Sequence, residues 1–265
     1  NPDNPTASRG QIVVLDGSRA GTLEGIDRHA YDGTPLPVTE ADLATAQITT
    51  RDIDRGTFPH FLLKEITEAP SSFRKTLRGK LREADGVLSV VLGPDTLPDD
   101  LRAALADGSI SRIVVTGQGT AAVAGESLAV ALADALSATA VRVEAVLATE
   151  LSGFAMRPDM SDTLVVAISQ SGTTTDTNRT VDVVRARGAR VVAIVNRRNS
   201  DLTDKVDGVL YTSDGRDVEM SVASTKAFYA QIAAGFLLSV ALADALGVAP
   251  PADRQGLLAA LRDLP

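Results

Sequence analysis

The sequence contains no cysteine and no tryptophan, and only two histidines among its 265 residues. Without cysteine, the chain has no disulfide, no thiolate metal site and no cysteine nucleophile. The two histidines, His29 and His60, are too few for a histidine metal cluster. We therefore expect no metal and no other cofactor, and we interpret His60 as a residue at the start of a helix.

Basic charge is also scarce. The 26 Lys and Arg residues are outnumbered by 34 Asp and Glu residues, which gives a formal net charge of −8. A nucleic acid or an anionic membrane surface would require a basic field, so we expect neither as a partner. The longest apolar run, residues 227–246, is interrupted by Gln231, Ser239 and Asp244, and no signal-peptide pattern is found. These features predict a cytoplasmic protein.

Residues 109–248 alternate short β-branched runs with helical patterns. The runs predict five strands, at 112–116, 141–146, 163–168, 190–195 and 208–212. The segments between and after them predict helices at 121–136, near 149–154, from 176 to 187, at 201–206 and at 225–246. Strands that are apolar throughout require a parallel sheet that is covered on both faces and joined by right-handed crossovers. We therefore predict an α/β fold with a doubly wound, five-stranded parallel sheet.

The N-terminal segment, residues 1–57, has a different pattern. It contains hairpin pieces, namely a strand candidate at 11–15, turns at 16–18 and 31–35, and a short apolar run at 36–38. These pieces hold too few apolar residues for a core of their own. We expect them to pack on something else.

Residues 58–108 predict helices that connect this segment to the sheet. An amphipathic helix is expected from His60 and should break at Pro70, and a second helix is expected from Phe73 to Arg82. A short third helix is predicted at 101–107.

The most informative run is Ser169-Gln170-Ser171-Gly172-Thr173-Thr174, between a predicted buried strand and a predicted helix. Such a loop gathers backbone N–H groups, hydroxyls and the positive helix end at one point. Because each hydrogen bond to a charged group contributes about 1.5–3 kcal/mol, three or four donors hold a phosphate monoester without a lysine. Gly172 lets the backbone approach a ligand or adopt a positive φ. The alternative is an ordinary serine-rich turn.

A second loop follows the first predicted strand, where ligands bind in doubly wound sheets. Residues 117–122 match the G-x-G-x-x-A fingerprint of dinucleotide-dependent oxidoreductases. The acidic residue that closes the second strand of that fold is missing, because Glu144 falls inside the predicted strand 141–146. A dinucleotide-binding domain stays as an alternative interpretation.

A third loop, residues 219–226, leads into the last predicted helix. Ser224 has the side chain of an N-cap. Lys226 in the first turn opposes the helix dipole, which indicates either a bound partner or a salt bridge to a neighbouring acid. Glu219 either accepts a hydrogen bond from a polyol hydroxyl or lies exposed in the loop.

Taken together, the runs 169–177 and 222–228 resemble the first SIS domain of the glucosamine-6-phosphate synthases, the glutamine:fructose-6-phosphate aminotransferases. The segment 60–66 with Pro70 is similar to the entry into their isomerase half, and residues 10–15 resemble the end of their glutaminase domain. The resemblance covers nearly the whole chain. It implies the tail of a glutaminase-like domain at 1–57, connecting helices at 58–108, a flavodoxin-like SIS domain at 109–248, and the start of a linker to a second SIS domain at 249–265.

The resemblance also assigns residues to a substrate site. It implies that the phosphate is held by Ser169, Ser171 and Thr174 with Gln170. It implies that the sugar is met by Thr120, Val222 and Ser224, and we include Glu219 in the same site. The family has a serine after the Gly-Thr pair of the first loop, and Ala121 stands there in this sequence.

The resemblance implies a fructose 6-phosphate-binding piece of an aminotransferase and isomerase that takes nitrogen from glutamine. The family's glutaminase cysteine is absent, and its base, histidine and lysine lie in the second SIS domain, so we expect the piece to be inactive alone. A non-catalytic sugar-phosphate sensor is the alternative, although its basic helix-turn-helix is not found. The implied partners are a hexose phosphate, the glutaminase domain and the second SIS domain. The small-residue runs 121–135 and 227–245 predict a homodimer.

Overall fold

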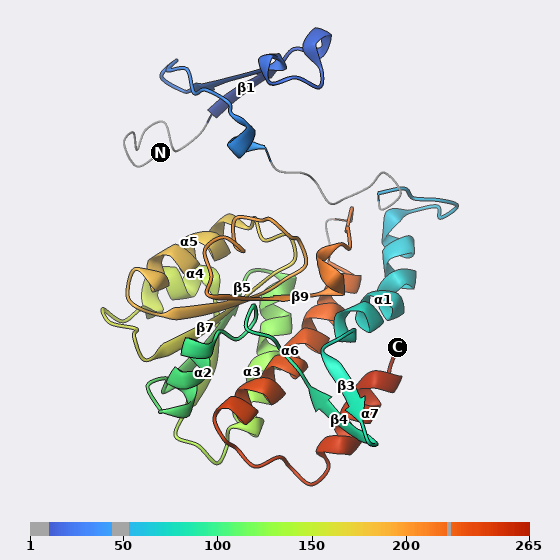
Figure 1. Cartoon of the computed structure of the whole chain (residues 1–265), viewed down its shortest axis with the longest axis vertical. Helices are drawn as coiled ribbons and strands as arrows, with labels where there is room; N and C mark the ends of the chain where they lie inside the picture. Colours follow the sequence, from blue (N-terminus) through green and yellow to red (C-terminus); the bar gives the residue numbers. More distant parts are fainter. Residues whose placement is uncertain (1–10, 44–52, 222–223) are drawn as a thin grey trace. The chain divides into compact units, whose positions relative to one another are not determined.

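A computed structural model describes residues 11–43, 53–221 and 224–265 (Figure 1). Its internal contacts divide the chain into two compact units, residues 1–46 and 47–265.

In the first unit, strands β1 (Gln11–Leu15) and β2 (Ile26–Ala30) form an antiparallel hairpin. Short 3-10 turns lie at Gly17–Arg19, Leu23–Gly25 and Glu40–Asp42. The predicted strand at 11–15 is confirmed, but its partner was missed, because Ile26–Ala30 is mostly polar. The predicted piece at 36–38 is not a strand; only an isolated bridge joins Pro35 to His29.

The second unit is built around a parallel sheet with the strand order β6-β5-β7-β8-β9. Its strands are β5 (Arg112–Gly117), β6 (Arg142–Leu147), β7 (Thr163–Ser169), β8 (Arg190–Val195) and β9 (Gly208–Tyr211). All four strand pairs are parallel. The predicted five-stranded, doubly wound α/β fold is therefore confirmed.

Alternate strand residues belong to two separate hydrophobic clusters, one on each face of the sheet. Leu164 and Val166 point to the face covered by α2 (Asp99–Ala106), α3 (Thr120–Ala135) and α6 (Lys226–Ala245). Val165 and Ala167 point to the other face, with α5 (Thr175–Arg185), α4 (Ala148–Glu150) and the π-helical turn Leu151–Ala155. All seven residues of β7 are buried, as expected for the central strand.

The sheet reverses its order between β5 and β7. The chain leaves β5 for β6 on one side and then returns to β7 on the other side of β5. The loops after β5 and β7 therefore diverge, and they leave a crevice at the carboxyl ends of these strands.

The connecting region differs from its prediction. Helix α1 (Phe61–Leu77) runs without a break through Pro70, and no second helix extends to Arg82. Phe73 and Leu77 pack with Ala233 and Leu237 of α6, so burial of this face outweighs the local cost of the proline. The chain then forms an unpredicted hairpin of β3 (Leu81–Ala84) and β4 (Val87–Val90).

Two other elements are corrected by the structure. Residues 201–206 form turns instead of the predicted helix, because Thr203 exchanges side-chain hydrogen bonds with the backbone of Ser200. The C-terminal residues 254–263 form helix α7 (Arg254–Asp263), in which Leu258 is fully buried. The amide of Gln255 in α7 bonds both backbone groups of Leu88 in β4.

Helix α6 is long and apolar enough to cross a membrane. This contradicts our prediction that the polar residues within 227–246 make the run unsuitable as a membrane span. However, 61% of its most apolar window is buried inside the unit. Its small residues pack against α3: a Cβ at Gly235 would lie 3.2 Å from the Cβ of Leu128. Burial in the core accounts for the apolarity, and this packing within the chain removes the basis on which a homodimer was predicted.

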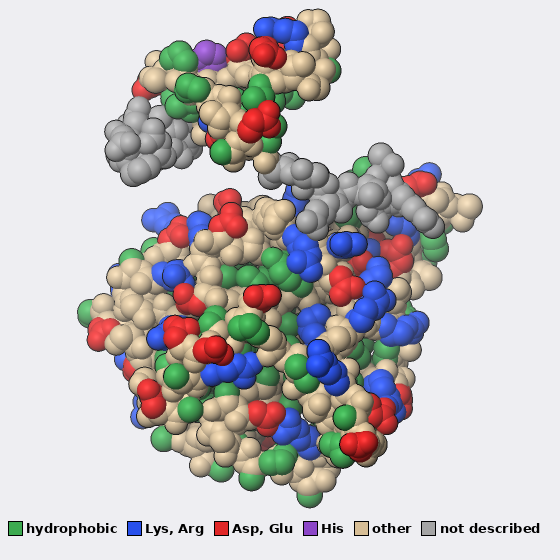
Figure 2. Space-filling view, in the orientation of Figure 1, with side chains coloured by type: hydrophobic (Ala, Val, Ile, Leu, Met, Phe, Trp, Pro, Cys, Tyr) green, Lys and Arg blue, Asp and Glu red, His purple; other side chains and the backbone are tan. Residues whose placement is uncertain are grey.

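On the face shown in Figure 2, acidic and basic side chains are interspersed.

Replacing Pro70 by alanine should stabilise the protein. Pro70 is exposed in the interior of α1 and cannot donate a hydrogen bond to the carbonyl of Ile66. We expect Pro70→Ala to raise the free energy of unfolding by about 1–3 kcal/mol, measured by urea denaturation. Ser71→Ala, at the neighbouring exposed position, is the control and should change it by less than about 0.5 kcal/mol. A less stable Pro70→Ala variant would contradict the prediction.

Candidate functional site

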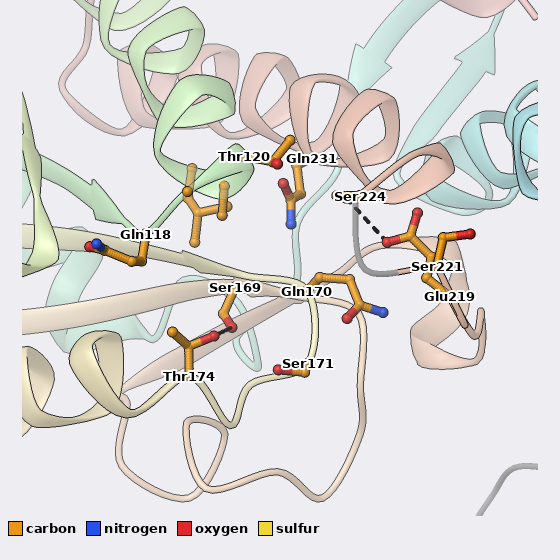
Figure 3. A pocket seen from close by; sticks show the side chains of 13 residues that line it. Gln118, Thr120, Ser169, Gln170, Ser171, Thr174, Glu219, Ser221, Ser224 and Gln231 are labelled. Carbon is orange, nitrogen blue, oxygen red and sulfur yellow. Dashed lines mark hydrogen bonds between the residues drawn. The ribbon is translucent and has the colours of Figure 1, made fainter. Parts of the chain in front are cut away.

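The crevice at the strand-order reversal contains a cavity of about 310 Å³ (Figure 3). Seven of the eight predicted site residues line it: Thr120, Ser169, Gln170, Ser171, Thr174, Glu219 and Ser224. The eighth, Val222, lies outside the described residues. The cavity is also lined by residues that the sequence did not single out for the site: Gln118, Gly119, Ala121, Ile168, Ser221 and Gln231.

The loop after β7 presents hydroxyls at the start of α5. Ser171 Oγ accepts hydrogen bonds from the backbone N–H and the hydroxyl of Thr173, at 3.2 and 2.9 Å, so its own proton is free to point to a ligand. Thr174 is the N-cap residue of α5, and its side chain makes no capping bond. Ser169 is 2% exposed, and its Oγ accepts a hydrogen bond from the N–H of Gly172 at 3.0 Å. Ser169 therefore shapes the loop, while Ser171 and Thr174 offer donors to the cavity.

Gly172 is required by the backbone and by a neighbouring side chain. Its φ is +67°, and a Cβ at this position would lie 2.0 Å from Ser200 Oγ. The positive φ that we expected is confirmed. The close approach, however, is made by Ser200 of the protein itself.

Glu219 caps helix α6. One of its carboxylate oxygens accepts hydrogen bonds from the Thr225 N–H at 2.8 Å, the Thr225 hydroxyl at 2.9 Å and the Ala227 N–H at 3.0 Å. The other oxygen accepts from the Ser224 hydroxyl at 3.1 Å. Glu219 is thus not the exposed loop carboxylate of one interpretation. The N-cap residue is Thr225 rather than Ser224, and the carboxylate occupies the positive end of the helix.

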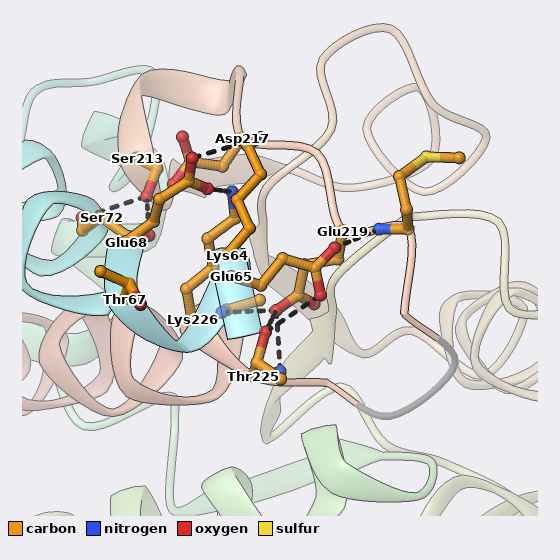
Figure 4. A network of polar contacts seen from close by, with 12 residues as sticks. Lys64, Glu65, Thr67, Glu68, Ser72, Ser213, Asp217, Glu219, Thr225 and Lys226 are labelled. Atoms are coloured by element: carbon orange, nitrogen blue, oxygen red, sulfur yellow. Dashed lines mark hydrogen bonds and ion pairs between the residues drawn. The ribbon is translucent and has the colours of Figure 1, made fainter. Parts of the chain in front are cut away.

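A second carboxylate, Glu65 of α1, holds the same loop from outside the cavity (Figure 4). It is 1% exposed and accepts hydrogen bonds from the N–H groups of Met220 at 2.5 Å and Ser221 at 3.2 Å. The sequence analysis did not single out this residue. A charged residue on the inward side of an amphipathic helix was the available signal, because such a group needs partners when it is buried.

Lys226 is paired with an acid of α1, as one of the two interpretations expected. Its Nζ lies 2.6 Å from Glu68, and the lysine is 4% exposed. Burial raises the pKa of Glu68, but the hydrogen bonds and charges of Lys226 and Lys64 outweigh it and hold that pKa below its ordinary value of 4.5. None of the described residues that line the cavity is a lysine or arginine.

The loop after β5 does not have the features of a dinucleotide site. Glu144 lies inside β6 and forms an ion pair with Arg112, so it does not close the strand. Gly117 is needed for packing, because a Cβ there would lie 3.0 Å from the carbonyl oxygen of Ile168. Ala121, where the resemblance led us to expect a serine, lies in the cavity wall.

The sheet and its cavity define a class: a doubly wound α/β domain of the phosphosugar-binding kind, with hydroxyls and helix N–H groups at the strand-order reversal. Residues 109–241 match the model of the SIS domain, and the chain belongs to the SIS domain family.

The related proteins are glutamine–fructose-6-phosphate aminotransferases [isomerizing]. The chain is 34% identical over 261 residues to that of Symbiobacterium thermophilum, which covers 96% of this chain and 40% of the relative. It is 39% identical over 263 residues to that of Corynebacterium glutamicum, covering 98% of this chain and 36% of the relative. The chain thus spans about two fifths of the length of these curated relatives.

Solved structures agree with this assignment. The C-terminal domain of glucosamine-fructose-6-phosphate aminotransferase from Francisella tularensis is 25% identical with a TM-score of 0.65, covering 80% of this chain and 55% of that chain. Glucosamine-6-phosphate deaminase from Thermotoga maritima has the same fold, with 18% identity and a TM-score of 0.53, covering 77% of this chain and 54% of that chain.

Removing the Glu65 carboxylate should destabilise the protein. Glu65→Ala leaves the N–H groups of Met220 and Ser221 without their acceptor. We expect the free energy of unfolding to fall by about 2–4 kcal/mol in urea denaturation. Glu83→Ala, in the exposed part of β3, is the control and should cost less than about 1 kcal/mol. Equal effects of the two substitutions would show that Glu65 does not hold the loop.

The ion pair between Glu68 and Lys226 should make stability depend on pH. Because the folded-state pKa of Glu68 is lowered, its contribution is present above the ordinary value of 4.5 and is lost as the pH falls through the folded-state pKa. Glu68→Gln should therefore be less stable than the unaltered protein near pH 7, by about 1–3 kcal/mol, and the two should converge at acidic pH.

Thermal unfolding of both proteins from neutral to acidic pH measures this difference. Glu126→Gln, on the exposed side of α3, is the matched control. A difference between Glu68→Gln and the unaltered protein that does not shrink on acidification would contradict the assignment.

Proposed function

We propose that the chain is the sugar-phosphate-binding part of a glutamine–fructose-6-phosphate aminotransferase, and that fructose 6-phosphate or a related hexose phosphate binds in the cavity at the end of β5 and β7. The observation that carries the proposal is the arrangement of Ser171, Thr174 and the first turn of α5, whose donors face one cavity. The 34–39% identity to aminotransferases supports it.

The phosphate belongs at the start of α5. The helix contributes roughly half a positive charge there, and its first N–H groups lack partners within the helix. Ser171 adds the proton of its hydroxyl, and Thr174 adds a hydroxyl that makes no helix cap and lies 3.5 Å from Ser169 Oγ. A phosphate monoester accepts several such bonds, each worth about 1.5–3 kcal/mol.

The sugar then extends toward the loops after β5 and before α6. Thr120, Ser221 and Ser224 line that part of the cavity. The role of Glu219 is revised: its oxygens are used by α6 and by Ser224, so it orients Ser224 rather than meeting the ligand alone. This side of the cavity offers hydroxyls, which match a polyol.

The remainder of the reaction belongs to parts that the relatives have and this chain does not span. We propose that a glutaminase domain supplies ammonia from glutamine, and that a second SIS domain supplies the groups that move the proton between C1 and C2. The part played by this chain is to bind and orient the sugar phosphate, which lowers the entropic cost of the reaction. No catalytic residue is assigned to it.

The first unit is consistent with a partner domain. The apolar side chains of β1 are about half exposed or more, from 49% at Ile12 to 72% at Leu15. An exposed apolar strand is a surface that folded proteins cover. We propose that residues 1–57 are the tail of a glutaminase-like domain, whose other strands cover β1.

Loss of the Ser171 or the Thr174 hydroxyl should weaken binding of the phosphorylated sugar. We expect Ser171→Ala and Thr174→Ala each to raise the Kd for fructose 6-phosphate about tenfold, because each removes one hydrogen bond to a charged group. Isothermal titration calorimetry measures the effect. Ser137→Ala, an exposed residue beyond the other end of α3, should leave the Kd unchanged.

Unphosphorylated fructose separates the phosphate from the sugar. Its weak binding should be the same in the unaltered protein and in both variants, since the substitutions act on the phosphate alone. An unchanged Kd for fructose 6-phosphate in both variants would contradict the placement of the phosphate.

A further inference from the structure

Gln231 carries a buried amide that has no partner. The residue lies in the second turn of α6 and is 2% exposed. Within the described part of the chain, neither its Oε1 nor its Nε2 forms a hydrogen bond. Because folded proteins pair almost all buried polar groups, an amide with both ends unpaired calls for an explanation.

The unpaired amide belongs to the cavity wall. Gln231 lines the same cavity as Ser169, Gln170 and Thr120, and Figure 3 shows its side chain reaching from α6 toward the space above Ser169 and Gln170. Gln118, on the loop after β5, lines the cavity too, and its Oε1 is also buried and unpaired. In Figure 3 the Gln118 side chain points away from Gln231, so Gln231 is the glutamine whose unpaired amide reaches into this space.

A third glutamine, Gln255, shows an amide with a structural role. Gln255 in α7 accepts a hydrogen bond from the N–H of Leu88 at 2.8 Å and donates one to its carbonyl oxygen at 2.9 Å. Both ends of that amide are used inside the protein. The amide of Gln231 has no such role, although leucine or methionine would fill the same position without an unpaired group.

We propose that Gln231 is a specificity-determining residue of the hexose-phosphate site, whose amide forms hydrogen bonds with a hydroxyl or carbonyl of the sugar when the ligand fills the cavity. The proposal rests on the function proposed above and goes beyond it in naming the side chain that recognises the sugar. An amide both donates and accepts, and so does a hydroxyl, whereas a phosphate dianion only accepts. Gln231 therefore matches the polyol rather than the phosphate.

The test compares Gln231→Leu with Gln255→Leu in the whole chain, using fructose 6-phosphate and inorganic phosphate as separate probes in calorimetric titrations. We expect Gln231→Leu to raise the Kd for fructose 6-phosphate about tenfold and to leave the Kd for inorganic phosphate within about twofold. Its thermal midpoint should stay the same or rise, because an unpaired buried amide is removed. Gln255→Leu should do the reverse: a lower midpoint and unchanged binding.

Gln231→Met carries the test if the branched leucine prevents folding, since methionine has nearly the shape of glutamine. An unchanged Kd for fructose 6-phosphate in the folded variant overturns the proposal. So does a fall of the midpoint as large as that of Gln255→Leu, which would show that the amide serves the protein through a bound water. If the substitution weakens the binding of fructose 6-phosphate and of inorganic phosphate equally, Gln231 does not recognise the sugar and the proposal is overturned. If the unaltered chain binds neither probe, the proposed function itself fails, and this result is distinct from the others.

Discussion

The parallel pairing of β5 with β7 is the constraint on which the rest of the site depends. Because these two strands are neighbours in the sheet but not in the chain, the connections that follow them turn to opposite faces. The ends of β5 and β7 are therefore not covered by either crossover, and a polar cavity is possible at the edge of a buried sheet. The β-branched residues that fill both faces also fix where the hydroxyls of residues 169–174 must lie.

The second requirement is a loop held in place opposite those hydroxyls, and the polar face of α1 holds it. Glu65, Glu68, Ser72 and Lys75 recur at helical spacing, and each contacts the chain between residues 213 and 226. Residues 216–221 of this loop form no strand or helix, so their backbone N–H groups need acceptors from elsewhere. The buried carboxylate of Glu65 in α1 and the half-buried carboxylate of Glu219 in the loop itself supply acceptors. The SIS domain is thus completed by a helix that precedes the segment matched by the family model.

Much of the fold could be predicted because β7 and β8 are apolar throughout and the glycine- and serine-rich turns between elements are strong local signals. The site residues could be named from two motifs, and the sheet topology brings them together. We predicted that helix α1 breaks at Pro70 because proline has a low helix propensity. In the structure the burial of Phe73 and Leu77 against α6 outweighs this local cost, and the helix continues. The partners of Glu65 could not be predicted, since only folding brings Met220 and Ser221 within hydrogen-bonding distance of it. Glu219 binds groups five to eight residues further along the chain, but the sequence analysis did not identify it as the cap of α6.

The electrostatics of the cavity follow from how the nearby charged side chains are paired. The chain is acidic, and Lys226, the basic residue at the start of α6, is paired with Glu68 outside the cavity. Glu219 places a negative charge at the end of α6, so the positive end of that helix is already used. The start of α5 is different: Asp176 is acidic in its first turn, but Thr174 makes no side-chain cap. Of these two helix ends, only that of α5 keeps donors for a ligand, and it keeps them where the hydroxyls gather. In the proposed function, a dianion is selected by the positions of donors rather than by opposite charge, so the proposed phosphate site is compatible with a chain that has a net charge of −8.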